Sequence, residues 1–353
     1  MFPNPLTSLL GVDLPVIQAP MAGGPTTPEL VAAVSDAGGL GSYAAAMLSP
    51  EAMAEGVARV RELTSRPFNV NLFVLETPQP TAVELEQAQA RLAPYRAALG
   101  QEPTAAAPER FCEDNRAQIE ALIALAPPVA SFTFGVLDET TVSHFHAAGS
   151  VVLGTATTVA EALAWEAAGA DAVCMQGAEA GGHRGTFLGD FEQSSIGLMA
   201  LLPQAAAALR VPVIAAGGIM DGRGIAAALM LGAQAAQLGT AFLCCPEAGI
   251  HAGWKTAIRT ARDDSTRLTR VFSGRYARGV VNAFMDDLRG SEADIPAYPV
   301  QNALTGGIRR AAAAQGRTEF MSLWAGQGAS LARELPAGEL VGVLEGELRA
   351  AMR

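Results

Sequence analysis

The chain has 353 residues, of which 50% are apolar and 17% are charged, so it can bury a large core and is not a disordered sequence. Its formal net charge of -11 disfavours nucleic acid and anionic membranes as partners, because both attract clustered positive charge. The length suits two or three average domains, or one α/β barrel with an appended cap.

The cysteines and the N-terminal region indicate a reduced, cytoplasmic protein. The four cysteines show neither the spacing of zinc ligands nor a secreted disulfide framework. Prolines stand near the N-terminus where a signal peptide would have a basic and then an apolar segment. Polar residues and glycines interrupt even the apolar stretch 226–245, so we predict no membrane span.

Short apolar runs alternate along the chain with alanine-rich stretches of helical length, which is typical of a parallel sheet covered by helices. We predict eight strands, at Pro15–Gln18, Gly39–Tyr43, Phe68–Phe73, Val129–Phe134, Val151–Gly154, Ala172–Gln176, Val211–Ala215 and Ala235–Leu238. The predicted helices include Pro28–Asp36, Pro50–Leu63, Asp138–Ala147, Val159–Ala168, Ser194–Ala208 and Gly222–Leu231. Eight such repeats indicate a TIM-type (β/α)8 barrel with its active site at the carboxyl ends of the strands. An open doubly wound sheet is disfavoured, because no G-x-G-x-x-G turn follows an early strand.

Two segments do not fit the repeat. Residues 76–112 are rich in Pro, Ala, Glu and Gln and predict a helical insertion, which could be a lid or a surface elaboration. After the eighth strand the chain is too long for one closing helix of typical length. We therefore expect a barrel over 1–245, a helical cap or substrate domain over 246–325, and helices over 326–353 that return to the barrel.

The strongest candidate for chemistry is His183, which lies in the glycine-rich stretch 174–186 directly after an apolar strand. Glycines let the backbone approach a ligand closely, and histidine exchanges protons near neutral pH. His144 and His146 lie two apart on a predicted helix and so point in different directions, which disfavours a metal site. His251 lies just after the last predicted strand and could face the site, but a histidine in such a position is more often structural, so it receives no role.

Further candidates follow other predicted strands. The small-residue loop Gln18–Gly24 could lie flat under a planar ligand, although an ordinary tight turn explains it equally well. Asn69 and Asn71 share one face of a strand, and Asn71 could bind a heteroaromatic ring. The Gly217-Gly218 pair and Gly239-Thr240 follow the last two strands, where barrels often bind phosphate.

Five segments together resemble the nitronate monooxygenase family, formerly called 2-nitropropane dioxygenases. They are Gln18–Gly24, Phe68–Phe73, Gln176–Thr186, Ala215–Ile219 and Gln237–Thr240. Of these segments, the sequence EAGGH at 179–183 best distinguishes this family from other barrel proteins. The segments YPVQNALT at 298–305 and SLWAGQ at 322–327 resemble the bacterial class I branch of that family.

The resemblance implies an FMN-dependent enzyme that oxidises alkyl nitronates with O2 to a carbonyl compound and nitrite, without reduced nicotinamide. The family histidine falls on His183, which would be the base toward a neutral nitroalkane or would position an anionic nitronate. Family flavin contacts fall on Met21, Asn71, Gln176 and Gly181, with the phosphate held by Gly218, Gln237, Leu238, Gly239 and Thr240. Tyr298 is the candidate substrate contact.

The resemblance leaves several points open. Relatives can carry a basic residue directly after the Leu304-Thr305 pair, whereas this chain has Gly306, so the cationic anchor for a nitro group is not identified. An FMN-dependent NAD(P)H oxidoreductase, such as a quinone or enoyl-thioester reductase, would share the barrel. A flavin-free phosphate-binding barrel enzyme is a second alternative. The physiological nitronate and the oligomeric state are not determined.

Overall fold

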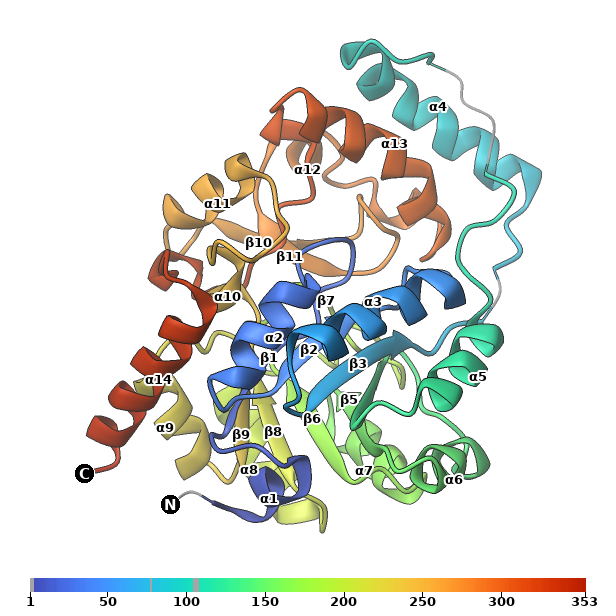
Figure 1. Cartoon of the computed structure of the whole chain (residues 1–353). Coiled ribbons are helices and arrows are strands. Elements are labelled where there is room, and N and C mark those ends of the chain that lie inside the picture. The colour runs from blue at the N-terminus through green and yellow to red at the C-terminus, as the bar shows by residue number, and fades with distance from the viewer. Residues whose placement is uncertain (1–2, 77, 104–107) are drawn as a thin grey trace.

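The computed structural model describes residues 3–76, 78–103 and 108–353, and its centre is a nearly closed barrel of eight parallel strands (Figure 1). The strands are β1 (Val16–Gln18), β2 (Gly41–Ala44), β3 (Phe68–Phe73), β4 (Val129–Thr133), β5 (Val151–Ala156), β6 (Ala172–Gln176), β8 (Val213–Ala216) and β9 (Ala235–Leu238). They follow the order β1-β9-β8-β6-β5-β4-β3-β2, and a single bridge between Ile17 and Leu40 closes the seam between β1 and β2. The predicted TIM-type barrel is confirmed.

Helices follow the strands and form an outer layer. They are α2 (Pro28–Asp36), α3 (Pro50–Leu63), α5 (Asn115–Leu125), α6 (Glu139–Ala147), α7 (Val159–Ala167), α8 (Leu198–Ala208), α9 (Gly222–Met230) and the short α10 (Thr240–Leu243). Thr27 and Ser49 cap α2 and α3 with their hydroxyl groups, and a proline follows each of them. Both choices suit a helix start, because the cap satisfies a free N–H and proline needs none there.

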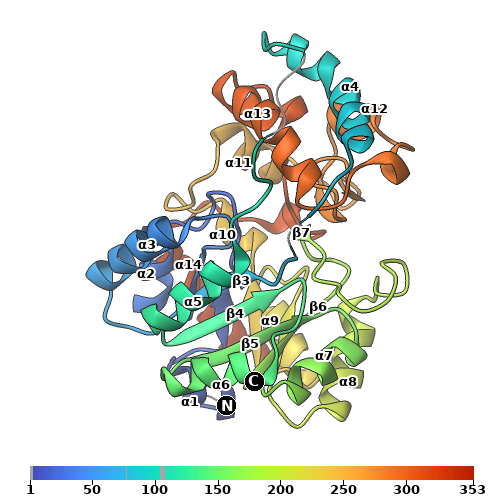
Figure 2. The same cartoon turned by 90° about the vertical axis from the view of Figure 1, so that its right-hand side faces the viewer.

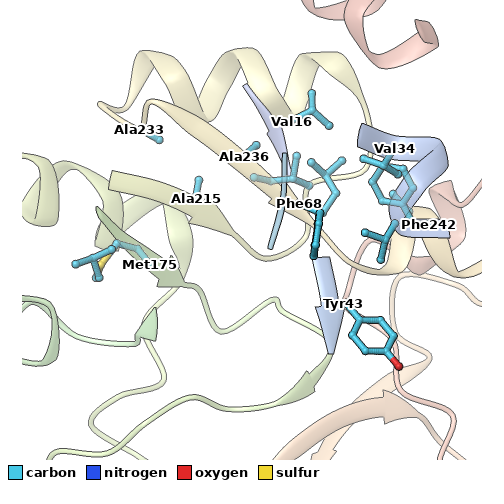
Figure 3. Packing of buried hydrophobic residues seen from close by; sticks show 14 of the residues in the cluster. Val16, Val34, Tyr43, Phe68, Met175, Ala215, Ala233, Ala236 and Phe242 are labelled. Carbon is cyan, nitrogen blue, oxygen red and sulfur yellow. The ribbon is translucent and has the colours of Figure 1, made fainter. Parts of the chain in front are cut away.

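The main core lies between the strands and these helices. Nearly every strand residue is buried, as expected for parallel strands covered on both faces. Figure 3 shows part of this cluster, with Val16 of β1 beside Ala236 of β9 and Val34 of α2 close by. Helix α1 (Pro5–Leu10) covers the end of the barrel at which the strands begin, and its Leu6 and Leu10 pack against strand residues of the barrel interior.

The cap contains a small sheet as well as helices. Its elements are α11 (Ala252–Arg259), β10 (Thr266–Thr269), β11 (Ala277–Val280), α12 (Ala283–Asp287), α13 (Val300–Ala314) and the 3-10 turns Glu292–Asp294 and Thr318–Phe320. We expected a helical cap and did not predict the strands. They form because β11 pairs on one side with β10 and on the other with β7 (Gly182–His183), a strand that the barrel supplies.

The insertion after β3 belongs spatially to the cap. Its helix α4 (Ala82–Ala98) lies beside α13 in both views (Figures 1 and 2). Buried Arg96 of α4 donates to the carbonyl of Leu304 in α13 at 3.2 Å, and Gln315 donates to the carbonyl of Leu99 at 3.0 Å. Residues 77 and 104–107 of the expected insertion lie outside the described part of the chain.

The last helix, α14 (Ala337–Ala351), follows the 3-10 turn Ala329–Leu331 and packs against α9 and α2 on the barrel. Gly222 at the start of α9 donates its N–H to the carboxylate of Glu347 at 3.0 Å. No helix in the described part of the chain is both long and apolar enough to cross a membrane.

One predicted helix boundary was wrong by four residues. We predicted a start at Ser194, whereas α8 begins at Leu198. The turn before it is held by Ser194, whose hydroxyl bonds to Thr186 and to the carbonyl of Phe191. The carboxylate of Glu179 then accepts from Leu198 N–H at 2.9 Å and takes the place of a side-chain cap.

Candidate active site

A cavity lies at the carboxyl ends of the barrel strands, between the barrel and the cap. Of the eleven residues to which the resemblance assigns a role, ten line it: Met21, Asn71, Gln176, Gly181, His183, Gly218, Gln237, Gly239, Thr240 and Tyr298. Leu238 does not line it, because its side chain is buried in the main core. The Leu238 carbonyl instead accepts a hydrogen bond from Ala19 N–H at 2.9 Å, which joins the loop after β1 to β9.

Gln176, at the end of β6, fixes the loop that carries His183. Its Nε2 donates to the carbonyl of His183 at 2.9 Å, and its Oε1 accepts from the N–H of Gly185 at 2.9 Å. On the cap side, His183 pairs with Ala277 of β11. The histidine is therefore held from the barrel and from the cap at once.

Two glycines in the same loop have different reasons to be glycine. Gly182 has a φ of +69°, in the left-handed region that other residues rarely adopt. At Gly181 a Cβ atom would lie 2.5 Å from the backbone nitrogen of Gly326, so only glycine lets the returning chain approach this closely. The glycine-rich sequence thus serves the backbone geometry around the histidine.

Ser273 orients the imidazole of His183. The His183 Nε2 atom lies 2.8 Å from Ser273 Oγ, and that hydroxyl donates to the carbonyl of Arg275 at 3.0 Å. A hydroxyl has one hydrogen to donate. When it donates to the Arg275 carbonyl, it accepts from Nε2–H, which leaves the lone pair of His183 on Nδ1.

Three aromatic rings surround the imidazole. The ring centroid of His183 lies 5.8 Å from that of Phe134 and 5.5 Å from those of Tyr298 and Trp324. Phe134 follows β4 with a φ of +81°, which is uncommon for a residue with a bulky side chain. Such backbone strain is found most often at functional sites, and here it accompanies a ring that faces the histidine.

Two partly buried cations, Arg275 and Arg309, lie near His183. Arg275 donates to the carbonyls of Arg184 and Thr186, and its guanidinium carbon lies 4.0 Å from the centroid of the Phe134 ring. Arg309 donates from Nη2 to the backbone carbonyl and the side-chain oxygen of Asn302, at 2.8 Å each. Within the described ranges, neither arginine forms an ion pair with a carboxylate.

These surroundings determine the charge on each group. Burial, together with the positive charges of Arg275 and Arg309, lowers the pKa of His183 to about 3, so the imidazole is neutral at pH 7. Burial lowers the pKa of each arginine to about 10, which leaves both charged. Burial also raises the pKa of Tyr298, so its hydroxyl stays protonated. The site around the histidine therefore has a net positive charge.

Amides and hydroxyls form a polar layer within the barrel below the cavity. Asn69 and Asn71 both donate from Nδ2 to the hydroxyl of Ser131, at 2.9 and 3.0 Å, which confirms that they share one face of β3. Asn71 lines the cavity, and Asn69 lies deeper, beside Ser42. Of the two amides, Asn71 is the one placed to contact a ligand.

The loops after β8 and β9 form the opposite part of the lining. Gly217 and Gly218 have φ values of +132° and +68°, so their backbone takes a path that favours glycine. Thr240 Oγ1 accepts a hydrogen bond from Gly326 N–H at 2.9 Å. Because the oxygen is the acceptor in this bond, the hydroxyl hydrogen of Thr240 is free to be donated to a ligand.

The histidines outside the cavity make other contacts. His146 lies 2.9 Å from a carboxylate oxygen of Asp171, and His251 accepts from Gly253 N–H at the start of α11. Among the residues that the structure describes, no three His, Cys, Asp or Glu side chains come together as a metal site.

Sequence reasoning missed several residues around His183, namely Phe134, Ser273, Arg275, Asn302, Arg309 and Trp324. Trp324 lies in a segment quoted for its resemblance but received no role. Arg309 stands next to Arg310 in the sequence, and only the docking of α13 distinguishes the one that lines the cavity from the exposed one. Single serine and arginine residues in the cap form no recognisable sequence pattern, whereas a glycine-rich loop directly after a strand does.

The fold and the placement of the cavity define a (β/α)8-barrel enzyme. A family model described as Nitronate monooxygenase matches residues 4–347. A probable nitronate monooxygenase of Staphylococcus aureus (strain Newman) is 42% identical over 99% of this chain and 98% of its own. The chain belongs to the nitronate monooxygenase family and is an oxidoreductase.

Solved structures agree with this assignment. A nitroalkane oxidase from Streptomyces ansochromogenes is 47% identical, with a TM-score of 0.91 over 98% of each chain. FabK from Thermotoga maritima is 27% identical, with a TM-score of 0.78 over 100% of this chain and 98% of its own. The barrel and its cap are therefore shared with more than one named protein, and the residues in the cavity must distinguish their chemistry.

Proposed function

We propose that this protein binds FMN in the cavity and oxidises alkyl nitronates with O2 to a carbonyl compound and nitrite. The observation that carries the proposal is a neutral histidine beside two partly buried cations that lack carboxylate partners among the described residues. Such a site favours an anionic substrate, since a bound anion would compensate buried positive charge. The names of the relatives support the same substrate class.

The residues of the cavity fit FMN. Gly218, Gly239 and the free hydroxyl hydrogen of Thr240 would hold the phosphate, which is the usual use of loops after the last two barrel strands. Met21 and the amide of Asn71 would contact the ring system. When bound, FMN would supply the electron transfer that side chains cannot carry out. Gln176 already binds the loop that carries His183 and would position this loop against the flavin ring system.

His183 would act through Nδ1. With Nε2–H directed at Ser273, the neutral imidazole can accept the proton that a nitroalkane loses from the carbon next to its nitro group. A preformed nitronate has already lost that proton. A neutral imidazole cannot supply positive charge to the anion, so in this proposal the positioning charge comes from the arginines and His183 contributes a hydrogen-bonding group.

An oxygen-consumption assay tests the proposal. Purified protein is loaded with FMN and mixed with ethyl nitronate or with nitroethane, while O2, nitrite and the flavin spectrum are followed together. We expect O2 uptake with nitrite release on the nitronate. Colourless protein that does not bind FMN, or FMN-loaded protein that releases no nitrite from either substrate, would contradict it.

A second measurement addresses the NAD(P)H oxidoreductase alternative. The FMN-loaded protein is mixed with NADH in the absence of O2, and flavin absorbance is recorded. We expect the flavin to stay oxidised, whereas rapid bleaching would favour the nicotinamide-dependent alternative.

A further inference from the structure

We propose that Arg309 is the anchor that binds an oxygen atom of the nitronate group and so determines the preference for anionic substrates. This inference rests on the proposed function and names the residue that would carry its specificity. It also answers the question raised by Gly306, since another cation on the same helix takes over the task.

The hydrogen bonds of Arg309 leave part of its guanidinium group unused. Nη2 is fixed by the two oxygens of Asn302, a residue that also lines the cavity. Nε is buried and has no hydrogen-bond partner in the described chain. For Nη1, likewise, the described residues offer no hydrogen bond. The side chain is thus oriented by Nη2, while Nη1 remains available to a ligand in the cavity that Arg309 lines.

Without a ligand, the buried Nε–H of Arg309 has no hydrogen-bond partner in the described part of the chain, which destabilises the folded protein. A buried charge or a buried N–H group without a partner destabilises a protein, and proteins normally compensate it with a carboxylate or a hydrogen bond. An anion in the cavity would supply both. The nitronate group is planar with two oxygens on one nitrogen, and because Asn302 already occupies Nη2, Arg309 would meet it through a charge-assisted N–H bond from Nη1 to one oxygen.

The other cation near His183, Arg275, is less suited to binding the substrate. Two N–H groups of Arg275 already bind the carbonyls of Arg184 and Thr186, and its guanidinium lies over the ring of Phe134. Arg275 does not line the cavity, whereas Arg309 does. We therefore assign Arg275 to holding the histidine loop against the cap, and Arg309 to the substrate.

Arg309 also lies where the reacting group would be. Its charge acts on both His183 and Tyr298, which line the same cavity. On α13, Gly306 does not line the cavity, whereas Arg309, three residues further along the helix, does.

The test compares Arg309→Gln and Arg309→Lys with a matched control, Arg310→Gln, which changes the neighbouring, exposed arginine. Nitrite, a small anion with two oxygens on nitrogen, is titrated into each FMN-loaded protein by isothermal calorimetry, which needs no turnover. The kcat and KM values for ethyl nitronate and for nitroethane are measured in parallel, with FMN affinity and circular dichroism as controls.

For Arg309→Gln we expect nitrite affinity to fall, and KM for ethyl nitronate to rise, by about tenfold or more, as for the loss of a charge-assisted hydrogen bond. KM for nitroethane should change far less, because a neutral substrate needs less compensation of charge. Arg309→Lys keeps the charge but loses the planar group that Asn302 orients, so it should be intermediate. Arg310→Gln should match the wild type.

Nitrite affinity within twofold of the wild type in a folded Arg309→Gln variant would overturn the assignment. An equal rise in KM for both substrates, together with weaker FMN binding, would also overturn the assignment, because it would show that Arg309 contacts the cofactor and not the substrate. If Arg309→Gln does not fold, Arg309→Lys decides, and unchanged nitrite binding there would count against the anchor. A wild type that oxidises neither substrate but binds nitrite through Arg309 would refute the proposed function and not this inference.

Discussion

His183 is neutral because of what surrounds it. Burial and two nearby arginines disfavour its protonated form, while Ser273 accepts the hydrogen on Nε2 in our assignment. The imidazole can thus accept a proton on Nδ1, but a pKa of about 3 makes it a weak base. A bound anion would offset the charges of the two arginines and so raise this pKa toward the range in which histidine acts as a general base.

The first prediction concerns the proton step. His183→Asn should reduce kcat/KM on nitroethane much more than on ethyl nitronate, because only nitroethane requires removal of a proton from carbon. The two values are obtained from O2 uptake under identical conditions. Equal losses on both substrates would show that His183 is needed for something other than accepting this proton.

The second prediction concerns Thr240. Thr240→Val should weaken FMN binding by about 1.5–3 kcal/mol, the contribution of a hydrogen bond to a charged group. It also removes the acceptor of Gly326 N–H, so the chain returning from the cap should become less well ordered at this point. FMN affinity is measured by fluorescence titration. Thr240→Ser keeps the hydroxyl and should remain close to the wild type; if Val and Ser variants bind FMN equally well, the phosphate lies elsewhere.

At the scale of elements, the short strand β7 joins the two parts of the molecule. It leaves the barrel after β6 and pairs with β11 of the cap, so the histidine sits on the connection itself. Helix α4 performs a similar task from the outside, through the bond from Arg96 to Leu304 in α13. Movement of the cap relative to the barrel would therefore change the surroundings of His183 directly.

The third prediction concerns the contact between α9 and α14. A Cβ atom on Gly222 would lie 2.2 Å from the backbone nitrogen of Leu348, so Gly222→Ala must displace α14. Overpacking of this kind costs about 1–3 kcal/mol. Gly342→Ala on the same helix meets no atom within 4 Å and should stabilise the protein by about 0.5–1 kcal/mol. Urea unfolding of both variants checks the pair, and a neutral Gly222→Ala would mean that α14 is docked less tightly than described.

At the scale of the whole molecule, stability should depend on pH through the buried histidine. In the unfolded chain His183 would take up a proton below about pH 6.5, whereas in the folded protein its pKa is about 3. Its contribution to the free energy of unfolding is therefore complete above pH 6.5 and is lost as pH falls toward 3.

The fourth prediction follows from this linkage. The free energy of unfolding should fall more between pH 7 and pH 5 in the wild type than in His183→Asn, which has no proton to take up at this position. Urea titrations at the two pH values give both differences. Identical slopes for the two proteins would contradict the low pKa of His183.

The barrel was predictable from the sequence because each strand is a short apolar run followed by a helix, and this pattern is local. The small sheet of the cap was not, since Thr266–Thr269 is short and largely polar and its sheet is completed by two residues of a glycine-rich loop. The same division applies to the site. Met21, Asn71 and Thr240 follow strands, and barrel geometry alone places strand ends together. The position of Arg309 at the cavity depends on how α13 packs on the rest of the protein, and no local sequence pattern determines this packing.

The seam of the barrel has a consequence for the order in which the site can form during synthesis. Val16 of β1 pairs with Ala236 of β9, whereas toward β2 its backbone pairs through the bridge from Ile17 to Leu40. The first strand to leave the ribosome therefore lacks its main partner until most of the chain has been made. Met21 follows that first strand and lies beside Gly239, so the cavity becomes complete only near the end of translation.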